Sequence, residues 1–185
     1  MKLNEVLKSE SISEIEEKII FEIIPELESE KGFLQNNPWH IYDVWDHTRK
    51  VFQSSKSGDE EIRLAILLHD VGKPYSYQDD ENGVRHFRGH AQKSAEMSRG
   101  ILQRLGYDDE KVDRICFLIS NHDKTIQPSK VKKSELPLFR KLLFMQYCDA
   151  SGYNPEYING VFERLDAISS KLIEREKSND DFEEI

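Results

Sequence analysis

The chain contains 185 residues, of which 37% are hydrophobic, and carries a formal net charge of −9, a balance typical of one globular domain. This charge argues against binding of extended nucleic acid, which needs a basic face, but a small phosphorylated ligand could still bind a local cationic pocket. The sequence shows no membrane-length apolar run and no apolar signal core at its N-terminus, so we expect a cytoplasmic protein with no membrane partner.

The first predicted helix begins at Ser11 and runs to about Ser29. Ser11 and Glu14 have the three-residue spacing of a capping box. Apolar residues then recur at helical spacing, at Ile12, Ile15, Ile19, Ile23 and Leu27. After a connection over residues 32–39, Asp43 is expected to cap a second helix. Its inner stripe would comprise Val44, His47 or Thr48, and Val51.

The third predicted helix, over residues 62–71, is apolar on nearly every face, which indicates a helix buried on all sides. It leads into His69-Asp70, and Gly72 is placed to end it in a left-handed cap conformation before Pro74. An imidazole and a carboxylate therefore lie side by side at the inner end of a core helix. Because burial of this pair without partners would cost several kcal/mol, we expect either a divalent metal or a hydrogen-bonded His-Asp pair without one.

In residues 75–89, larger side chains recur at every second position on both sides of Asn82-Gly83, which is a turn signal. This pattern predicts a short two-stranded ribbon. A fourth helix is expected over residues 89–105, and Asp108 caps a fifth that reaches residue 123. Ser134 would cap a sixth helix ending near residue 149, and Asn154-Pro155 begins a seventh. The two cysteines lie in apolar helical contexts and should be free buried thiols, Cys116 and Cys148. The predicted fold is all-α, about seven helices with one short β-ribbon.

Ionisable side chains stand at inward or end positions of several predicted helices. His47 lies on the apolar stripe of the second helix, His90 opens the fourth, and His122 ends the fifth on its inner face. Asp149 lies on the buried side of the sixth helix, where a carboxylate needs a partner. Each residue alone is better explained as a hydrogen-bonded core residue or a cap. Together with His69-Asp70 they indicate a metal site built from facing helices.

The order of these residues matches a known signature. His47, then His69-Asp70, then Asp149 resembles the H…HD…D signature of the HD superfamily of metal-dependent phosphohydrolases. Residues 37–48, 69–74 and 87–90 also resemble the HD domain that follows the polymerase part of bacterial CCA-adding tRNA nucleotidyltransferases. The 185 residues show no strand-rich segment with a glycine-serine motif and paired aspartates. The resemblance thus implies the hydrolase module and not CCA polymerisation.

The resemblance also implies a division of the chain. Residues 1–36 would form an N-terminal helix packed on the domain, and residues 37–153 the HD core. Residues 154–177 would add a C-terminal helix to the same domain, followed by a frayed acidic tail over residues 178–185.

The ligands that the resemblance implies for a first divalent ion are His47, His69, Asp70 and Asp149. A second ion would bind His90 and His122 with Asp70 bridging; with one ion, these two histidines would contact the phosphate. Imidazole and carboxylate ligands are typical of sites for Mn²⁺, Fe²⁺, Co²⁺, Ni²⁺ or Mg²⁺, and not of a zinc site built from thiolates.

Several further residues are candidates for contacts with the substrate. Lys73 resembles the lysine that meets the substrate phosphate, and the alternative is a solvated lysine at a helix end. Arg85 and Arg88 could add charge beside the metal, and Asp123 is a possible further ligand or substrate contact. Asp70 would orient the attacking water or accept its proton. Three aromatic residues would either stack on a base or pack the ribbon onto the helices: Tyr75, Tyr77 and Phe87.

The sequence therefore predicts a metal-dependent phosphatase or phosphodiesterase that acts on a nucleotide or other small phosphate ester through a metal-activated water. The alternative is a metal-binding regulatory or RNA-associated module with little catalysis.

Overall fold

The structure is a computed structural model that describes residues 2–178. Its elements in chain order are α1 (Leu3–Val6), α2 (Glu14–Ile23), the 3₁₀ turn η1 (Pro25–Glu30), α3 (Val44–Ser54), α4 (Glu60–Leu68), η2 (Lys73–Tyr75), β1 (Gln78–Asp79), β2 (Arg85–His86), α5 (His90–Arg104), α6 (Asp109–Asn121), η3 (Pro128–Lys130), η4 (Lys133–Glu135), α7 (Leu136–Ala150) and α8 (Pro155–Lys177). The predicted all-α fold with one short ribbon is confirmed. The short helix α1 was not predicted.

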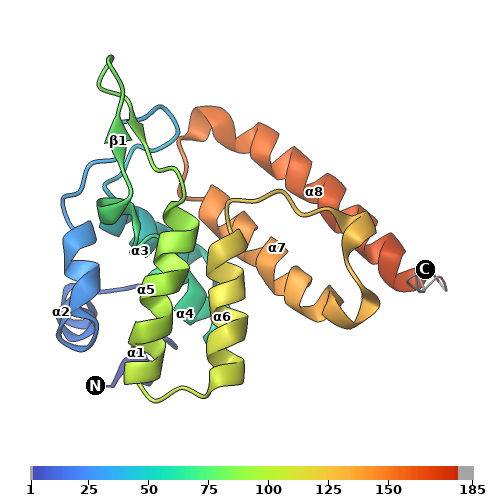
Figure 1. Ribbon diagram of the computed structural model, residues 1–185, viewed down its shortest axis with the longest axis horizontal. Coiled ribbons are helices and arrows are strands. Elements are labelled where there is room, and N and C mark those ends of the chain that lie inside the picture. The colour runs from blue at the N-terminus through green and yellow to red at the C-terminus, as the bar shows by residue number, and fades with distance from the viewer. Residues whose placement is uncertain (1, 179–185) are drawn as a thin grey trace.

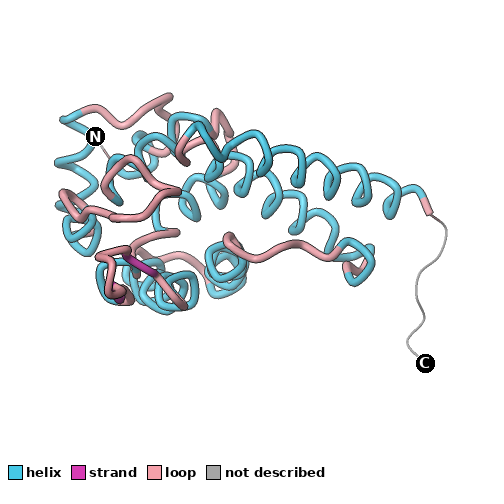
Figure 2. Tube along the Cα trace, turned by 90° about the horizontal axis from the view of Figure 1, so that it is seen from above, coloured by secondary structure: helices cyan, strands magenta, loops and turns pink. Residues whose placement is uncertain are grey.

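Helix α4 is the centre of the bundle. Every residue from Ile62 to Lys73 is buried, and α4 packs against α3, α5, α6 and α7. Figure 1 shows α5 and α6 as an antiparallel pair beside α4, with the ribbon rising above the upper end of α5. Helix α8 lies along α7 and extends beyond the other helices towards the C-terminal end (Figure 2). This arrangement brings the end of α4, the start of α5 and the end of α6 to one side of the bundle.

The first long helix begins later and ends earlier than the sequence predicts. Ser13 and Glu16 form the capping box instead of Ser11 and Glu14, since the Ser13 amide donates to Glu16 Oε2 at 2.7 Å. Pro25 then ends the α-helix because it has no amide proton and its ring clashes with the preceding turn. The buried face of this helix also differs from the predicted stripe. Ile15, expected on the inner face, is 68% exposed, whereas Ile20 and Ile24 lie in the core.

Gly72 does not adopt the predicted left-handed conformation. Its φ is −85°, and helix α4 ends earlier, with His69 as its C-cap residue. The glycine is needed for close approach, because a Cβ atom would lie 2.5 Å from the Ser94 amide nitrogen of α5. The absence of a side chain at Gly72 therefore lets α5 pack directly against the segment that carries His69 and Asp70.

Other local predictions are confirmed with one exception. Asp43, Asp108 and Asn154 cap α3, α6 and α8 through side-chain oxygens that accept backbone N–H groups. Ser134 does not cap α7, since it lies inside the 3₁₀ turn η4 that precedes this helix. The two cysteines are free and buried. Within residues 2–178, no helix is long and apolar enough to cross a membrane. The predicted frayed tail lies, from residue 179 onwards, outside the described residues.

Candidate metal centre

Six ionisable side chains from five segments meet at the inner side of the bundle. His47 lies on α3, His69-Asp70 follows α4, His90 opens α5, His122 follows α6, and Asp149 lies near the end of α7. All are buried to 4% exposure or less, except His90, which is half-buried. His90 and His122 meet because α5 and α6 run antiparallel, which places the first residue of one beside the last of the other (Figure 1).

The first group comprises His47, His69, Asp70 and Asp149. The His47 Nε2 atom lies 2.9 Å from Asp149 Oδ1 and 3.7 Å from Asp70 Oδ2. The His69 Nε2 atom lies 3.2 Å from Asp70 Oδ2 and 3.5 Å from Asp149 Oδ1. The two Nε2 atoms are 3.4 Å apart. Two imidazole nitrogens and two carboxylate oxygens thus surround one small space.

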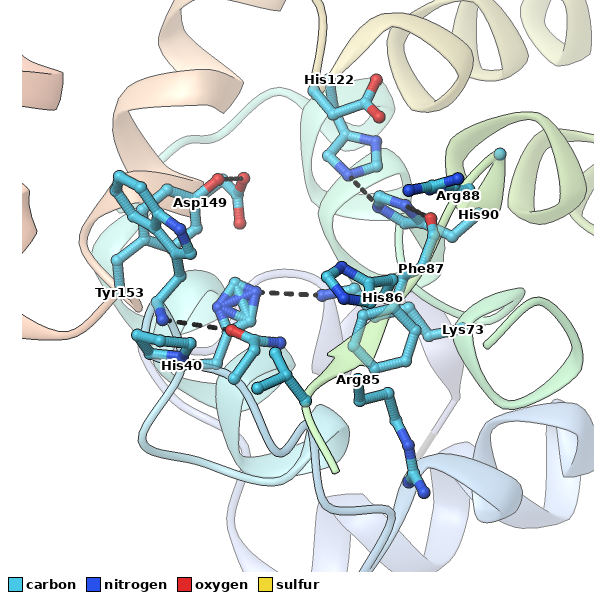
Figure 3. A pocket seen from close by; sticks show the side chains of 16 residues that line it. His40, Lys73, Arg85, His86, Phe87, Arg88, His90, His122, Asp149 and Tyr153 are labelled. Carbon is cyan, nitrogen blue, oxygen red and sulfur yellow. Dashed lines mark hydrogen bonds between the residues drawn. The ribbon is translucent and has the colours of Figure 1, made fainter. Parts of the chain in front are cut away.

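The second group comprises Asp70, His90 and His122. The Asp70 Oδ1 atom lies 3.5 Å from His90 Nε2 and 3.8 Å from His122 Nε2. The two imidazole Nε2 atoms are 3.2 Å apart, the rings are nearly perpendicular at 76°, and Figure 3 shows the contact between them in the pocket. Asp70 therefore presents one oxygen to each pair of histidines.

The four histidines share one arrangement at Nδ1. Each Nδ1 atom faces a backbone carbonyl, at 2.7 Å in His69 and His122, 2.8 Å in His90 and 3.3 Å in His47. A hydrogen on Nδ1 satisfies these carbonyls and leaves the Nε2 lone pairs directed at the centre. The Asp70 Oδ1 atom lacks a hydrogen-bond donor, whereas Oδ2 is paired with the Lys73 ammonium at 2.7 Å. A divalent cation fits this donor set, because it would satisfy lone pairs that otherwise face one another.

The charges of the cluster reinforce one another. Burial disfavours the charged form of Asp70, but the neighbouring His69 and Lys73 outweigh it and hold the pKa of Asp70 well below its usual range. Burial likewise opposes the charge on His69, yet Asp70 and Asp149 raise the pKa of this imidazole to about 10. Burial and the adjacent imidazoles lower the pKa of His122 to about 4. At neutral pH a proton on His69 therefore competes with a cation for the first group.

The turn after α7 holds two members of the first group. The Tyr153 hydroxyl donates to Asp149 Oδ2 at 2.7 Å, and the Gly152 carbonyl faces His47 Nδ1. A Cβ atom on Gly152 would lie 2.6 Å from that Nδ1 atom, so only glycine permits this approach. Our sequence interpretation missed both residues; the only local signal is a glycine and a tyrosine three and four residues after Asp149.

Lys73 is buried, at 4% exposure, which excludes the alternative of a solvated lysine at a helix end. Its Nζ atom lies 2.7 Å from Asp70 Oδ2, donates to Gln35 Oε1 at 2.7 Å and lies 3.3 Å from His40 Nε2. A phosphate would therefore have to share Lys73 with these three partners. Sequence interpretation did not find Gln35 and His40, because they belong to an irregular connection without periodicity.

Buried Glu30 was also missed. It is 0% exposed, accepts a hydrogen bond from the Thr48 hydroxyl at 3.1 Å, and has a second oxygen without a partner. Burial and the negative charge of Asp70 raise the pKa of Glu30 well above its usual range. The Glu30 carboxyl group is thus hydrogen-bonded to the residue of α3 that follows His47.

A pocket of about 470 Å³ opens over the cluster. Figure 3 shows Asp149, Tyr153 and His40 on one side and Phe87, Arg88 and His90 on the other. Trp39, Lys73, His122 and Asp123 also line it.

The candidate substrate contacts differ in their freedom to bind a ligand. The Arg85 guanidinium donates to both carboxylate oxygens of Asp79 and to the Leu34 carbonyl, so three of its five N–H donors are already used. Arg88 is exposed and forms no ion pair or hydrogen bond with the residues that the structure describes. Asp123 is exposed on the pocket rim. Tyr75 and Tyr77 do not line the pocket, and Tyr77 packs on Phe33 with ring centroids 5.2 Å apart.

Comparison with known proteins assigns this arrangement to a family, because the model of the HD domain matches residues 40–151. The chain belongs to the HD domain family. The match includes all six ionisable residues of the two groups and ends just before the Gly152-Tyr153 pair. The resemblance to the HD superfamily of metal-dependent phosphohydrolases is thereby confirmed.

Two curated relatives of this HD domain protein are named tRNA nucleotidyltransferases. It is 35% identical to the A-adding tRNA nucleotidyltransferase of Deinococcus radiodurans over 104 residues, 54% of this chain and 24% of the relative. It is 32% identical to the CC-adding tRNA nucleotidyltransferase of Thermus thermophilus over 158 residues, 83% and 33% of the two chains. The multifunctional CCA protein of Shewanella denitrificans is 29% identical over 143 residues, 75% and 32%. The chain thus spans about a quarter to a third of these relatives.

Proposed function

We propose that this protein is a metal-dependent phosphohydrolase that cleaves a nucleotide or another small phosphate ester. The observation that supports it most is the Asp70 carboxylate, whose two buried oxygens face two pairs of imidazoles; Oδ2 is paired with Lys73, whereas Oδ1 receives no hydrogen bond. A buried carboxylate oxygen that the protein leaves without a donor points to an external cation, because the desolvated oxygen would otherwise cost free energy.

His47, His69, Asp70 and Asp149 would hold the first cation through the Nε2 and carboxylate oxygen atoms that already face one another. A divalent cation at this position would polarise a phosphoryl oxygen and lower the pKa of a water molecule to about 7. His90 and His122 would bind a second ion, with Asp70 bridging, or contact the phosphate directly. Mn²⁺, Fe²⁺, Co²⁺, Ni²⁺ and Mg²⁺ all accept this combination of nitrogen and oxygen ligands.

The protein's side chains would position the attacking water and stabilise the charge of the phosphate. Asp70 would orient the attacking water or take its proton, since it lies at the centre of both groups. Lys73 would keep Asp70 ionised and placed, and its ammonium could turn towards a phosphate in the pocket. Arg88 would supply a further cation at the pocket rim. Phosphoryl transfer depends mainly on such positioning and charge stabilisation.

The expected substrate is small. A pocket of about 470 Å³ falls within the range of about 300–1,000 Å³ that is typical for small-molecule sites. The net charge of −9 repels an extended polyanion but leaves a local cationic pocket effective.

A panel of phosphate esters tests the proposal. Purified protein would be assayed on nucleoside monophosphates, 2′,3′-cyclic nucleotides, dinucleoside polyphosphates and glycerol phosphate with added Mn²⁺ or Ni²⁺, alongside elemental analysis. We expect metal-dependent turnover that is lost in His69→Ala and Asp149→Ala proteins together with the bound metal. Metal retained at wild-type stoichiometry in both variants would contradict the ligand assignment.

A second candidate function is an RNA-associated module with little catalysis, which the tRNA-related names of the relatives favour. Binding of tRNA at physiological salt, measured beside the ester panel, separates the two functions. Efficient tRNA binding or cleavage without turnover of any small ester would favour the RNA-associated module.

A further inference from the structure

Trp39 is an exposed tryptophan at the mouth of the pocket. Its side chain is 48% exposed, whereas the other tryptophan of the chain, Trp45, is 1% exposed and donates its indole N–H to Glu17. Large aromatic side chains bury most of their surface when they serve only packing. Trp39 gains no such burial and therefore needs another explanation.

The backbone around Trp39 is held firmly. The Trp39 amide donates to Asn37 Oδ1 at 3.1 Å, and the Trp39 carbonyl accepts from the Asn154 amide at 2.8 Å. The Asn154 side chain also donates to the Pro38 carbonyl at 3.0 Å. The connection before α3 is thus tied to the cap of α8, so the indole is held in place although it is exposed.

The ring of Tyr157 on α8 lies behind the indole. The two ring centroids are 4.5 Å apart with an interplanar angle of 38°, and Tyr157 is itself 37% exposed. Trp39 lines the same pocket as His90, His122 and Asp149, which belong to the two ligand groups. One pocket is therefore lined both by an exposed aromatic ring and by residues of the two candidate ligand groups.

We propose that Trp39, backed by Tyr157, is the stacking platform for the base of a nucleotide whose phosphate lies at the metal centre. This inference rests on the proposed function for the position of the phosphate. Base stacking on an aromatic ring accepts any base, because every base has a π-face. The substrate class is accordingly a nucleoside phosphate, in preference to an aliphatic phosphate ester, and the stacking surface differs from the one predicted on the ribbon.

Tryptophan fluorescence tests the platform without catalysis. Adenosine carries the base but no phosphate, so a phosphohydrolase leaves it intact, and glycerol 1-phosphate carries a phosphate without a base. We expect adenosine to quench the emission of the full-length protein saturably, and glycerol 1-phosphate to leave it unchanged. In Trp39→Leu protein only the buried Trp45 remains, and the quenching should disappear. Quenching that is absent, or equal in both proteins, would overturn the proposal.

Kinetics provide the second measurement. We expect the ratio of kcat/KM for adenosine monophosphate to that for glycerol 1-phosphate to fall about tenfold in Trp39→Leu, since stacking contributes about 1–3 kcal/mol per base. Trp39→Phe should recover part of the ratio. Tyr75→Leu is the matched control, because Tyr75 is 56% exposed but lies outside the pocket. An unchanged ratio in Trp39→Leu would contradict the platform.

The two measurements separate this inference from the proposed function. Turnover of esters with no preference for nucleotides and no adenosine quenching would refute the platform alone. Saturable adenosine quenching that depends on Trp39, without turnover of any ester, would support the platform and refute the hydrolase.

Discussion

The two ends of helix α4 each bury a charged side chain, and they treat it in opposite ways. At the N-terminal end, Arg63 is 2% exposed and donates to the carbonyls of Leu7, Ser9 and Phe52 and to the Ser55 hydroxyl. Its guanidinium also lies 3.5 Å from the centroid of the Phe52 ring. At the C-terminal end, Asp70 Oδ2 is paired with Lys73 at 2.7 Å, but Asp70 Oδ1 receives no hydrogen bond and faces the imidazoles of His90 and His122.

The difference separates a structural buried charge from a functional one. The protein supplies every partner of Arg63, so this residue joins α1 and the end of α3 to the core without a ligand. At Asp70 the partners are lone pairs and other charges, which a cation would complete. Buried polar groups in folded proteins are nearly always satisfied, so the unpaired Asp70 Oδ1 atom, which faces two imidazoles, supports the proposed cation site.

The largest expected effect is that of Asp70→Asn. An amide is uncharged and has only one acceptor oxygen, so it cannot present an anionic oxygen to each pair of imidazoles. We therefore expect bound metal to be lost and turnover to fall about 10³-fold or more. Metal content, thermal midpoint and steady-state kinetics on the best ester of the panel would be measured. Asp70 is the counter-ion of buried Lys73, which keeps Gln35 as a partner, so we expect the protein to remain folded with a lower thermal midpoint. Full turnover with bound metal would remove Asp70 from the catalytic role.

Arg63→Met tests the other end of the helix. The variant keeps the apolar stem but leaves the buried carbonyls of Leu7 and Ser9 without donors, so we expect a loss of about 3 kcal/mol or more in unfolding free energy. Denaturant unfolding would measure it. Arg140→Met is the matched control: this exposed arginine pairs with Glu176, and its loss should cost less than about 1 kcal/mol. Equal stability of the two variants would refute the structural role of Arg63.

Gly152→Ala probes the support of the cluster. The added methyl group would collide with the His47 ring, so we expect metal affinity to fall about 10- to 100-fold, the usual range for groups that orient a ligand. Gly160→Ala is the control, because a Cβ atom at that position of α8 meets nothing within 4 Å. Metal titration and thermal unfolding of both variants distinguish a local displacement of His47 from a general loss of stability. Identical metal affinities would show that α3 and α7 accommodate the methyl group.

The pH dependence of metal binding is the smallest effect. Asp70 and Asp149 raise the pKa of His69 to about 10, so this imidazole carries a proton at neutral pH that a cation must displace. The apparent metal affinity should therefore rise with pH, by at most about tenfold per unit between pH 7 and pH 9, until the pH reaches that pKa. Isothermal titration calorimetry in buffers of different ionisation enthalpy would count the released proton. A flat affinity over this range would show that His69 binds metal already deprotonated.

The sequence alone predicted the features that depend on neighbouring residues. The caps at Asp43 and Asp108, the start of the last helix at Asn154-Pro155 and the turn at Asn82-Gly83 each need only a side chain and a backbone within a few positions, and all four are confirmed. The family could also be inferred, because the residues of the HD domain motif follow one another in a set order along the sequence. Errors occurred where two local signals competed, as at Ser11 and Ser13.

Only the tertiary structure decided how the candidate ligands and the pocket are completed. Lys73 was expected to contact a substrate phosphate, yet the side-chain oxygen of Gln35, 38 positions away, already accepts a hydrogen bond from its ammonium group. Gly152 has no local reason to be a glycine; the His47 ring, 105 positions earlier in the chain, imposes it. Trp39 lies in an irregular connection, and its place at the pocket mouth depends on hydrogen bonds to Asn154. Such contacts join distant segments and leave no periodic pattern, so sequence spacing cannot reveal them.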